Sequence, residues 1–259
     1  HIDIVRGQGT VGLEIMEQLP DVVNIVVCLG GGGLAAGVAL AAKLKAKEMG
    51  RKIKVYAVQA SEAAAYPASL KAGRPLEVKI NPTIADGIAV AKPGKVPFEI
   101  IKSHVDRVVT VTEDEIAKAM LGVMERSKLV VEAGGAVGAA ALAAKKLKLK
   151  GKTAVILSGG NIDPLLLQRV IRHGLAASDR YTNIAVMLPD RPGQLVRTAQ
   201  AVASAHANVV EVLHTRHGNG LEISEVELDL SVETRGKAHR DEVVESLKKA
   251  GLKPRLFEN

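Results

Sequence analysis

The stretch Val22–Ala42 reads VVNIVVCLGGGGLAAGVALAA. Its β-branched run Ile25–Leu29 predicts a buried strand, and the alanine-rich segment Leu34–Glu48 predicts a helix. The four glycines between them, Gly30–Gly33, let backbone N–H groups converge on one point, because no Cβ blocks the approach of a ligand. The start of the helix adds free amides and the positive end of its dipole. We therefore expect a phosphate group here; a turn without a ligand, which needs only one or two glycines, is the simpler alternative.

The loop alone leaves the kind of phosphate open. A P-loop is excluded, since Gly32 and Gly37 have the right separation but Val38 stands where that motif has lysine. The dinucleotide fingerprint can be aligned as Gly31-x-Gly33-x-x-Ala36, but the next strand ends in Gln59 where an acid is expected. Dinucleotide binding therefore remains a rival interpretation.

A second glycine turn narrows the choice. The strand expected at Thr153–Leu157 runs into Ser158-Gly159-Gly160-Asn161, again ahead of a helix. Because open α/β sheets bind ligands at the carboxyl edge of their strands, we expect the Ser158 hydroxyl on the same edge as the glycine loop.

The order of the elements predicts two domains, at residues 1–175 and 176–259. In the first, short β-branched runs alternate with alanine-rich helical stretches, which is typical of a parallel sheet covered by helices. The expected strands are Ile25–Leu29, Val55–Val58, Arg107–Val111 and Thr153–Leu157. The expected helices are Gly9–Gln18, Leu34–Glu48, Glu113–Ser127, Ala136–Leu147 and Pro164–Gly174, with a capping box after Thr112.

The second domain follows the order strand, helix, strand, strand, helix, strand. This βαββαβ order is the ferredoxin-like arrangement. The segments are Thr182–Leu188, Gln194–Ala205, Val209–His217, Leu221–Val232, Arg240–Ala250 and Pro254–Glu258, with a tight turn at Gly218–Gly220. Alternation of apolar and polar residues in the fourth segment predicts a sheet with one exposed face.

The composition excludes several classes of partner. Lys and Arg exceed Asp and Glu by 35 to 28, but the basic residues are spread along the chain, and with two Phe, three Tyr and no Trp the stacking surface of a nucleic-acid binder is missing. We expect no nucleic-acid partner and no membrane contact, because the longest apolar run is too interrupted to span a bilayer. The single Cys28 excludes an internal disulfide, and no signal-peptide pattern opens the chain, so a cytoplasmic location is predicted.

Five stretches together resemble, in order and spacing, the later part of threonine ammonia-lyase (threonine dehydratase), a pyridoxal phosphate enzyme of fold type II. They are Gly7–Ile15, Gly30–Leu34, Thr83–Ile88, Glu132 with Gly134–Gly138, and Ser158–Asn161. The tail from Thr182 resembles an ACT domain, whose usual first turn matches Asp190–Gly193. The resemblance implies a tryptophan synthase β-like parallel sheet followed by a ferredoxin-like regulatory domain.

The resemblance also implies site residues. The cofactor phosphate would lie on Gly30, Gly31, Gly32 and Gly33, with Leu34 closing the loop. Ser158 would face the pyridine nitrogen, Gly87 would line the ring, and Asn161 would support the Ser158 turn. Glu132 is a further candidate; a carboxylate that merely stabilises a helix start explains it equally well.

The implied reaction is β-elimination of the hydroxyl group of threonine as water, giving an enamine that takes up water again and hydrolyses to 2-oxobutanoate and ammonia; serine would give pyruvate and ammonia. A hydroxyl beside the pyridine nitrogen leaves that nitrogen largely unprotonated, whereas a carboxylate would hold it protonated. The resulting weaker electron sink suits elimination. The cofactor phosphate is also a candidate acid for the departing hydroxyl.

One departure from the family is decisive for activity. The lysine that bonds the cofactor normally lies in Ser-x-Lys-x-Arg, which does not precede His1. Lys71 has its arginine one residue too far, at Arg74, and Lys248 lies on a solvated helix face. We expect the chain to begin inside the catalytic domain, to contain no catalytic residue of its own, and to be inactive alone.

A second departure concerns metal ions. In the related serine racemases an acid pair after the glycine loop holds a divalent cation, but the matching positions here are Gln59 and Ala65. The histidines lack the paired helical spacing of a metal site. We therefore expect no metal, and a racemase-like enzyme is a weaker alternative.

The ACT resemblance implies regulation by an amino acid such as isoleucine or valine. Asp190, Gly193 and Asn208 are the expected effector-binding residues. ACT domains commonly bind effectors between subunits, so we expect a homodimer or homotetramer. A different class of function stays open, namely a non-catalytic amino-acid sensor or partner subunit.

Overall fold

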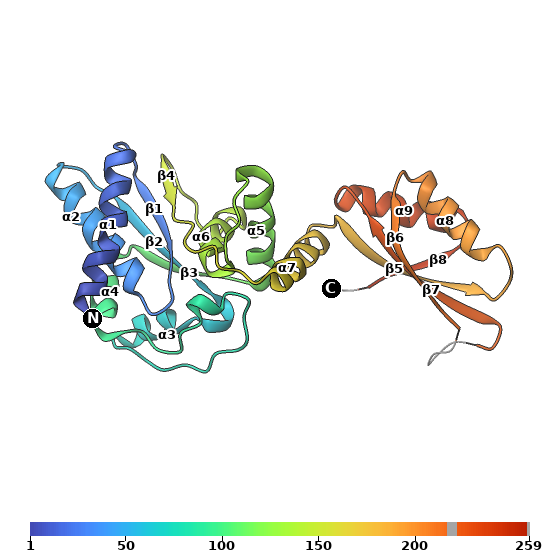
Figure 1. The fold of residues 1–259 in the computed structure, drawn as a ribbon, viewed down its shortest axis with the longest axis horizontal. Helices are drawn as coiled ribbons and strands as arrows, with labels where there is room; N and C mark the ends of the chain where they lie inside the picture. The colour runs from blue at the N-terminus through green and yellow to red at the C-terminus, as the bar shows by residue number, and fades with distance from the viewer. Residues whose placement is uncertain (217–221, 258–259) are drawn as a thin grey trace. The chain divides into compact units, whose positions relative to one another are not determined.

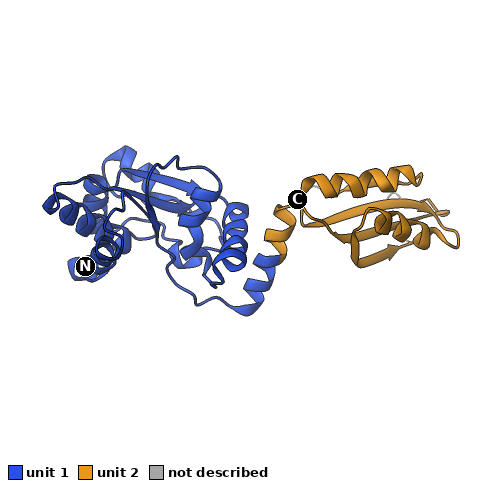
Figure 2. Ribbon diagram, turned by 90° about the horizontal axis from the view of Figure 1, so that it is seen from above, with its two compact units in different colours: residues 1–171 blue, residues 172–259 orange. Residues whose placement is uncertain are grey.

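The computed structural model describes residues 1–216 and 222–257. The chain divides into two compact units, His1–Ile171 and Arg172–Asn259, coloured separately in Figure 2. The unit boundary lies inside helix α7 (Pro164–Ala177), where the predicted domain change after residue 175 also falls. The tight turn predicted at Gly218–Gly220 lies outside the described residues, as do the predicted strand ends at His217, Leu221 and Glu258.

Unit 1 is built on a four-stranded parallel sheet, which confirms the predicted fold class (Figure 1). Its strands are β1 (Asn24–Cys28), β2 (Lys54–Ala60), β3 (Arg107–Val111) and β4 (Thr153–Val155), in the order β3-β2-β1-β4. Its helices before α7 are α1 (Ile2–Gln18), α2 (Gly33–Glu48), α3 (Ala65–Ala72), α4 (Lys95–His104), α5 (Glu113–Ser127) and α6 (Ala133–Ala143), with short 3-10 turns at Ser61–Ala63 and Asp86–Ile88.

Helices cover both faces of this sheet. Along β1, Ile25 and Val27 belong to a core formed with α1, α2 and α4, whereas Val26 and Cys28 belong to a second core formed with α5 and α6. Successive side chains of a strand point to opposite faces, so a strand buried on both faces must be apolar throughout. This accounts for the unbroken apolar run that ends at the glycine loop.

The glycines of Gly7–Ile15 serve the packing of α1 on α2. A Cβ on Gly12 would lie 2.8 Å from the carbonyl oxygen of Val38, and one on Gly37 would collide with the carbonyl oxygen of Val5. The two helices therefore approach more closely than larger residues would permit. The predicted start of α1 at Gly9 is wrong, because the helix begins at Ile2.

Unit 2 has the predicted βαββαβ order. It comprises β5 (Tyr181–Pro189), α8 (Gln194–Ser204), β6 (Asn208–Thr215), β7 (Glu225–Glu233), α9 (Lys237–Lys249) and β8 (Lys253–Leu256). The antiparallel sheet has the order β6-β7-β5-β8, which confirms the ferredoxin-like arrangement. Alternate residues of β7, from Val226 to Val232, are buried against α8 and α9, as the alternation predicted.

Several predicted boundaries are wrong for local reasons. Strand β7 begins at Glu225, although the prediction included residues 222–224, which lead into it through a turn in which Glu225 N–H donates to the carbonyl of Glu222. Helix α6 begins at Ala133 and ends at Ala143; Lys145, which the prediction included, has a left-handed φ of 56°. The capping box of Thr112 and Glu115 is confirmed.

Helices α3 and α4 were not predicted. Each carries a proline, Pro67 or Pro97, at its third residue. Proline usually indicates a helix break, but the first turn tolerates it because its N–H groups have no partner within the helix.

Candidate functional site: a phosphate loop at the carboxyl edge of the parallel sheet

The glycine loop connects β1 directly to α2. Gly32 is the N-cap residue of α2 and has φ 101°, a conformation that glycine alone adopts readily. A Cβ there would collide with the Tyr66 hydroxyl and lie 2.8 Å from Cβ of Pro97. Gly32 is therefore required by backbone conformation and by space together.

Two carbonyl groups of the loop are held by hydrogen bonds. The Gly31 carbonyl accepts hydrogen bonds from the Tyr66 hydroxyl and from Gly94 N–H, each at 3.2 Å. Tyr66 is fully buried, and burial raises the pKa of its phenol above the ordinary value, so it remains a donor. The Gly32 carbonyl accepts from Ala36 N–H at 2.9 Å and starts α2.

The N–H groups of the same loop are free. Among the described residues, no atom accepts a hydrogen bond from the backbone N–H groups of residues 30–35. These amides stand at the N-terminus of a 16-residue helix, where the dipole favours negative charge. The residues present therefore fit the phosphate of a cofactor.

Ser158 lies at the same edge of the sheet as this loop. It follows β4, which pairs with β1, and its Oγ lies 3.2 Å from Sγ of Cys28 at the end of β1. Helix α6 packs closely on the Ser158 turn, because a Cβ on Gly135 would overlap the Ser158 carbonyl oxygen. The hydroxyl is thus held at the carboxyl edge of the sheet, where the sequence predicted it.

Glu132 occupies the N-cap position of α6 without capping it. Its side chain accepts no hydrogen bond from the helix N–H groups. Its carboxylate lies instead against two glycines: a Cβ on Gly159 would be 2.6 Å from Oε2, and a Cβ on Gly87 would be 3.3 Å from Oε1. The side chain is therefore directed between the Gly87 and Ser158 segments.

The segment around Gly87 packs against both the glycine loop and α6. A Cβ on Gly30 would lie 3.0 Å from Cα of Ile88, and one on Gly134 would lie 3.3 Å from Cγ2 of Ile88. The structure therefore brings the glycine loop, Gly87, Glu132 and Ser158 together from four separate parts of the sequence. Leu34 follows the loop half-buried between both cores.

Asn161 is less closely tied to this cluster. It is exposed, and the described residues offer its side chain no hydrogen bond. Its predicted support of the Ser158 turn stays a prediction. Lys71 is also exposed, near the end of α3.

Two residues important for the site were not identified from the sequence. Tyr66 supports the loop from a segment 35 residues away. Gln59, the position compared with a metal ligand, is fully buried, accepts from Tyr66 N–H at 2.9 Å and donates to the Ala63 carbonyl at 3.4 Å. Its amide thus positions Tyr66.

Within residues 1–216 and 222–257, no group of three or more His, Cys, Asp or Glu side chains is arranged to hold a metal ion.

The expected effector residues are divided between the two ends of β5. Asp190 and Gly193 follow its last residue, and Asp190 lies 3.6 Å from the Arg216 guanidinium. Asn208 is level with Tyr181, the first residue of β5, and donates to Glu233 at 3.2 Å. The eight intervening steps correspond to about 27 Å in an antiparallel strand. One ligand does not reach both groups within a single chain.

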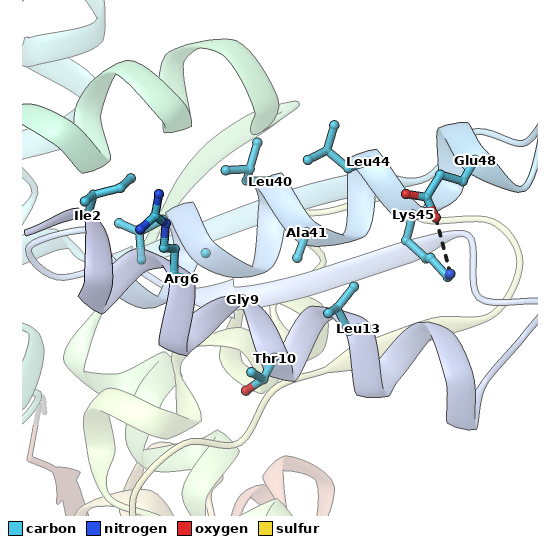
Figure 3. Close-up of a pocket in the computed structure, with 12 residues that line it drawn as sticks. Ile2, Arg6, Gly9, Thr10, Leu13, Leu40, Ala41, Leu44, Lys45 and Glu48 are labelled. Carbon is cyan, nitrogen blue, oxygen red and sulfur yellow. Dashed lines mark hydrogen bonds and ion pairs between the residues drawn. The ribbon is translucent and has the colours of Figure 1, made fainter.

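A groove of 640 Å³ lies between α1 and α2 (Figure 3). Its lining is mainly aliphatic, with Leu13, Leu40 and Leu44 labelled in the figure, and its Lys45 and Glu48 side chains pair with each other at 3.3 Å. The loop amides of residues 30–35 are not part of its lining. The cofactor is therefore not assigned to this groove.

Among the described residues, no helix is long and apolar enough to cross a membrane.

The chain is similar to two curated proteins along most of its length. It is 43% identical over 249 residues to the L-threonine ammonia-lyase of Geobacter sulfurreducens, covering 96% of this chain and 61% of that protein. It is 44% identical over 254 residues to the L-threonine ammonia-lyase of Thermotoga maritima, covering 98% and 62%. The chain thus spans about three-fifths of the length of these relatives.

The fold is also similar to that of a solved structure. The processed form of threonine deaminase isoform 2 from Solanum lycopersicum matches with a TM-score of 0.59 and 34% identity, covering 65% of this chain and 49% of that one. The model of the pyridoxal-phosphate-dependent enzyme family matches residues 1–159, which carry the loop, Gly87, Glu132 and Ser158. The chain belongs to the family of pyridoxal-phosphate-dependent enzymes.

Proposed function

We propose that this chain supplies the phosphate side and the ring-nitrogen side of the cofactor site in a lyase that converts L-threonine to 2-oxobutanoate and ammonia. The observation that carries the proposal is the row of free N–H groups at residues 30–35, on the same sheet edge as the Ser158 hydroxyl. The names of the two curated relatives support threonine as the substrate. Serine, one methyl group smaller, is proposed as a second substrate giving pyruvate.

Each residue of the cluster has a proposed task. The amides of Gly30–Gly33 and Leu34 bind the phosphate, and the dipole of α2 favours its charge. Ser158 donates a hydrogen bond to the pyridine nitrogen, and Gly87 leaves room for the ring. When bound, pyridoxal phosphate supplies the electron sink that permits elimination at the neighbouring carbon. A neutral hydroxyl keeps this sink weak, which suits rapid loss of the β-hydroxyl group.

Glu132 is proposed to bound the ring pocket on the side of Gly87 and Gly159. Its carboxylate accepts no hydrogen bond from the described residues and is half-buried, so it is available to a cofactor or substrate group. Asn161 is proposed to brace the Ser158 turn when the site is complete.

Unit 2 is proposed to be an ACT domain that senses an amino acid. The ferredoxin-like topology supports this, together with the Asp190–Gly193 turn, in which Gly193 has φ 90° and caps α8. Asp190 and Gly193 of one subunit and Asn208 of another are proposed to share the effector, since the two groups lie at opposite ends of β5.

We propose a homodimer or homotetramer, because an effector shared in this way needs two subunits. Strand β6 is an edge strand of its sheet, and Val210, Val212 and Leu213 on it are exposed. An edge strand with apolar side chains is a ready surface for pairing with another chain. We propose that β6 contributes to the contact between subunits.

The proposed function is tested by binding and by product formation. Equilibrium dialysis against pyridoxal phosphate and against pyridoxal is expected to retain the phosphorylated form far better. The protein that carries this chain, supplied with pyridoxal phosphate, is expected to release 2-oxobutanoate from threonine. Equal retention of both forms contradicts the phosphate assignment. Binding of isoleucine or valine without any binding of pyridoxal phosphate would favour the sensor alternative.

A further inference from the structure

The single cysteine of the sequence contacts Ser158, a residue of the proposed cofactor site. Cys28 is the last residue of β1, its side chain is 7% exposed, and its Sγ lies 3.2 Å from Oγ of Ser158. The proposed function uses Ser158 but has no role for this thiol. The pair is polar in a core that is otherwise aliphatic on this face of β1.

The direction of this hydrogen bond decides where the Ser158 hydrogen points, because the thiol and the hydroxyl each carry one hydrogen. If Ser158 donates to sulfur, its hydrogen points down into the sheet and only oxygen lone pairs face the site. An unprotonated pyridine nitrogen is itself an acceptor, so two acceptors would then meet. If the thiol donates instead, the Ser158 hydrogen is free to point into the site.

The surroundings of Cys28 keep its thiol protonated. Burial raises the pKa of the thiol above its ordinary value and outweighs the hydrogen bond to Ser158, which lowers it. The group is therefore a neutral S–H at physiological pH and is available as a donor.

We propose that Cys28 is a positioning residue whose S–H donates to Ser158 Oγ and thereby directs the Ser158 hydrogen toward the cofactor nitrogen. The second half of this statement rests on the proposed function, because it takes the ring nitrogen as the group that Ser158 meets. The first half concerns this chain alone.

The donor direction is tested on the unliganded chain by Raman spectroscopy of the S–H stretch. Because the sequence has one cysteine, the band has one source, and Cys28→Ala provides the blank. We expect the band at lower wavenumber in the wild type than in Ser158→Ala, since donation weakens the S–H bond. Val26→Ala, which trims the same face of β1 without touching the pair, should leave the band in place. Identical bands in the wild type and Ser158→Ala would overturn the proposal.

The positioning role is tested by pyridoxal phosphate affinity. Cys28→Ala is expected to weaken binding about 2- to 10-fold, the range of one neutral hydrogen bond, whereas Cys28→Ser keeps a donor and restores most of it. Equal weakening by both variants would overturn the role, because packing alone would then explain it. If the wild type binds no pyridoxal phosphate, the proposed function fails and the positioning role with it, while the S–H band still decides the donor direction.

Discussion

The hydroxyl of Tyr66 donates a 3.2 Å hydrogen bond to the carbonyl oxygen of Gly31. This contact joins the start of α3 to the glycine loop and holds the Gly31 carbonyl, which also accepts from Gly94 N–H. The buried Gln59 amide holds Tyr66 in turn, by accepting from its backbone N–H. The loop is therefore shaped by a residue outside the motif that identifies it.

Replacing Tyr66 with Phe tests this support. The Gly31 carbonyl keeps Gly94 N–H as a donor, so we expect a loss of about 0.5–1.5 kcal/mol in unfolding free energy and a several-fold weaker affinity for pyridoxal phosphate. Urea unfolding and equilibrium dialysis measure the two effects. Tyr56→Phe is the matched control, because the described residues offer the Tyr56 hydroxyl no hydrogen bond. An unchanged affinity in Tyr66→Phe would show that the loop holds its shape without the phenol.

Gly32→Ala is expected to be severe. The added Cβ is strained by φ 101° and meets Tyr66 and Pro97, so we expect about 2–5 kcal/mol of destabilisation and loss of phosphate-dependent binding. Gly122→Ala in α5 adds the same methyl group where no atom lies within 4 Å, and it should keep or raise stability. Urea unfolding compares the two. Similar stabilities would refute the steric argument.

Glu113 anchors the segment that carries Gly87. Its carboxylate accepts from the Thr83 hydroxyl at 2.6 Å and from Ile84 N–H at 2.8 Å. Glu113→Ala should free this segment, lower pyridoxal phosphate affinity and cost about 1–3 kcal/mol of stability. Hydrogen exchange at Ile84 and dialysis are the measurements. Exposed Glu99→Ala on α4 controls for loss of charge, and protection at Ile84 that survives Glu113→Ala would contradict the anchoring role.

In unit 2, His239 holds two backbone groups at once. Its Nδ1 accepts from Arg235 N–H at 3.0 Å, so its Nε2 carries the hydrogen and donates to the Ala205 carbonyl at 2.7 Å. His239→Ala leaves both groups without partners, and we expect about 2–5 kcal/mol of destabilisation by urea unfolding. Exposed Glu242→Ala, on the same helix α9, should stay within about 0.5 kcal/mol of wild type. Equal effects at the two sites would refute the bridging role.

The proposed subunit contact at β6 predicts that charged substitutions on this strand reduce the size of the oligomer. Leu213→Glu combined with Val212→Lys should shift the protein to a smaller species in light scattering coupled to size exclusion, because charges replace exposed apolar groups on an edge strand. Ile223→Lys changes a fully exposed apolar residue outside β6 and should not change the size. A double variant that keeps the wild-type mass would place the contact elsewhere.

Local patterns predicted the elements that depend on neighbours in the chain. The apolar run of β1, the four glycines and the start of α2 are consecutive, so their dihedral preferences and burial are visible in order. The capping box at Thr112 and the alternation of β7 were predictable for the same reason. Helices α3 and α4 were missed because a proline in the first turn resembles a break when its hydrogen-bond context is unknown.

The sequence by itself determined a parallel sheet with a glycine loop between β1 and α2, a serine at the same edge and a ferredoxin-like second unit, because strand and helix periodicities and glycine turns are local properties. Only the tertiary structure decided that Tyr66 supports Gly31, that Glu132 leaves its helix uncapped, and that Cys28 meets Ser158. It also decided that Asp190 and Asn208 lie at opposite ends of β5. These relationships arise from strand order, register and close packing between distant segments, which no stretch of sequence contains.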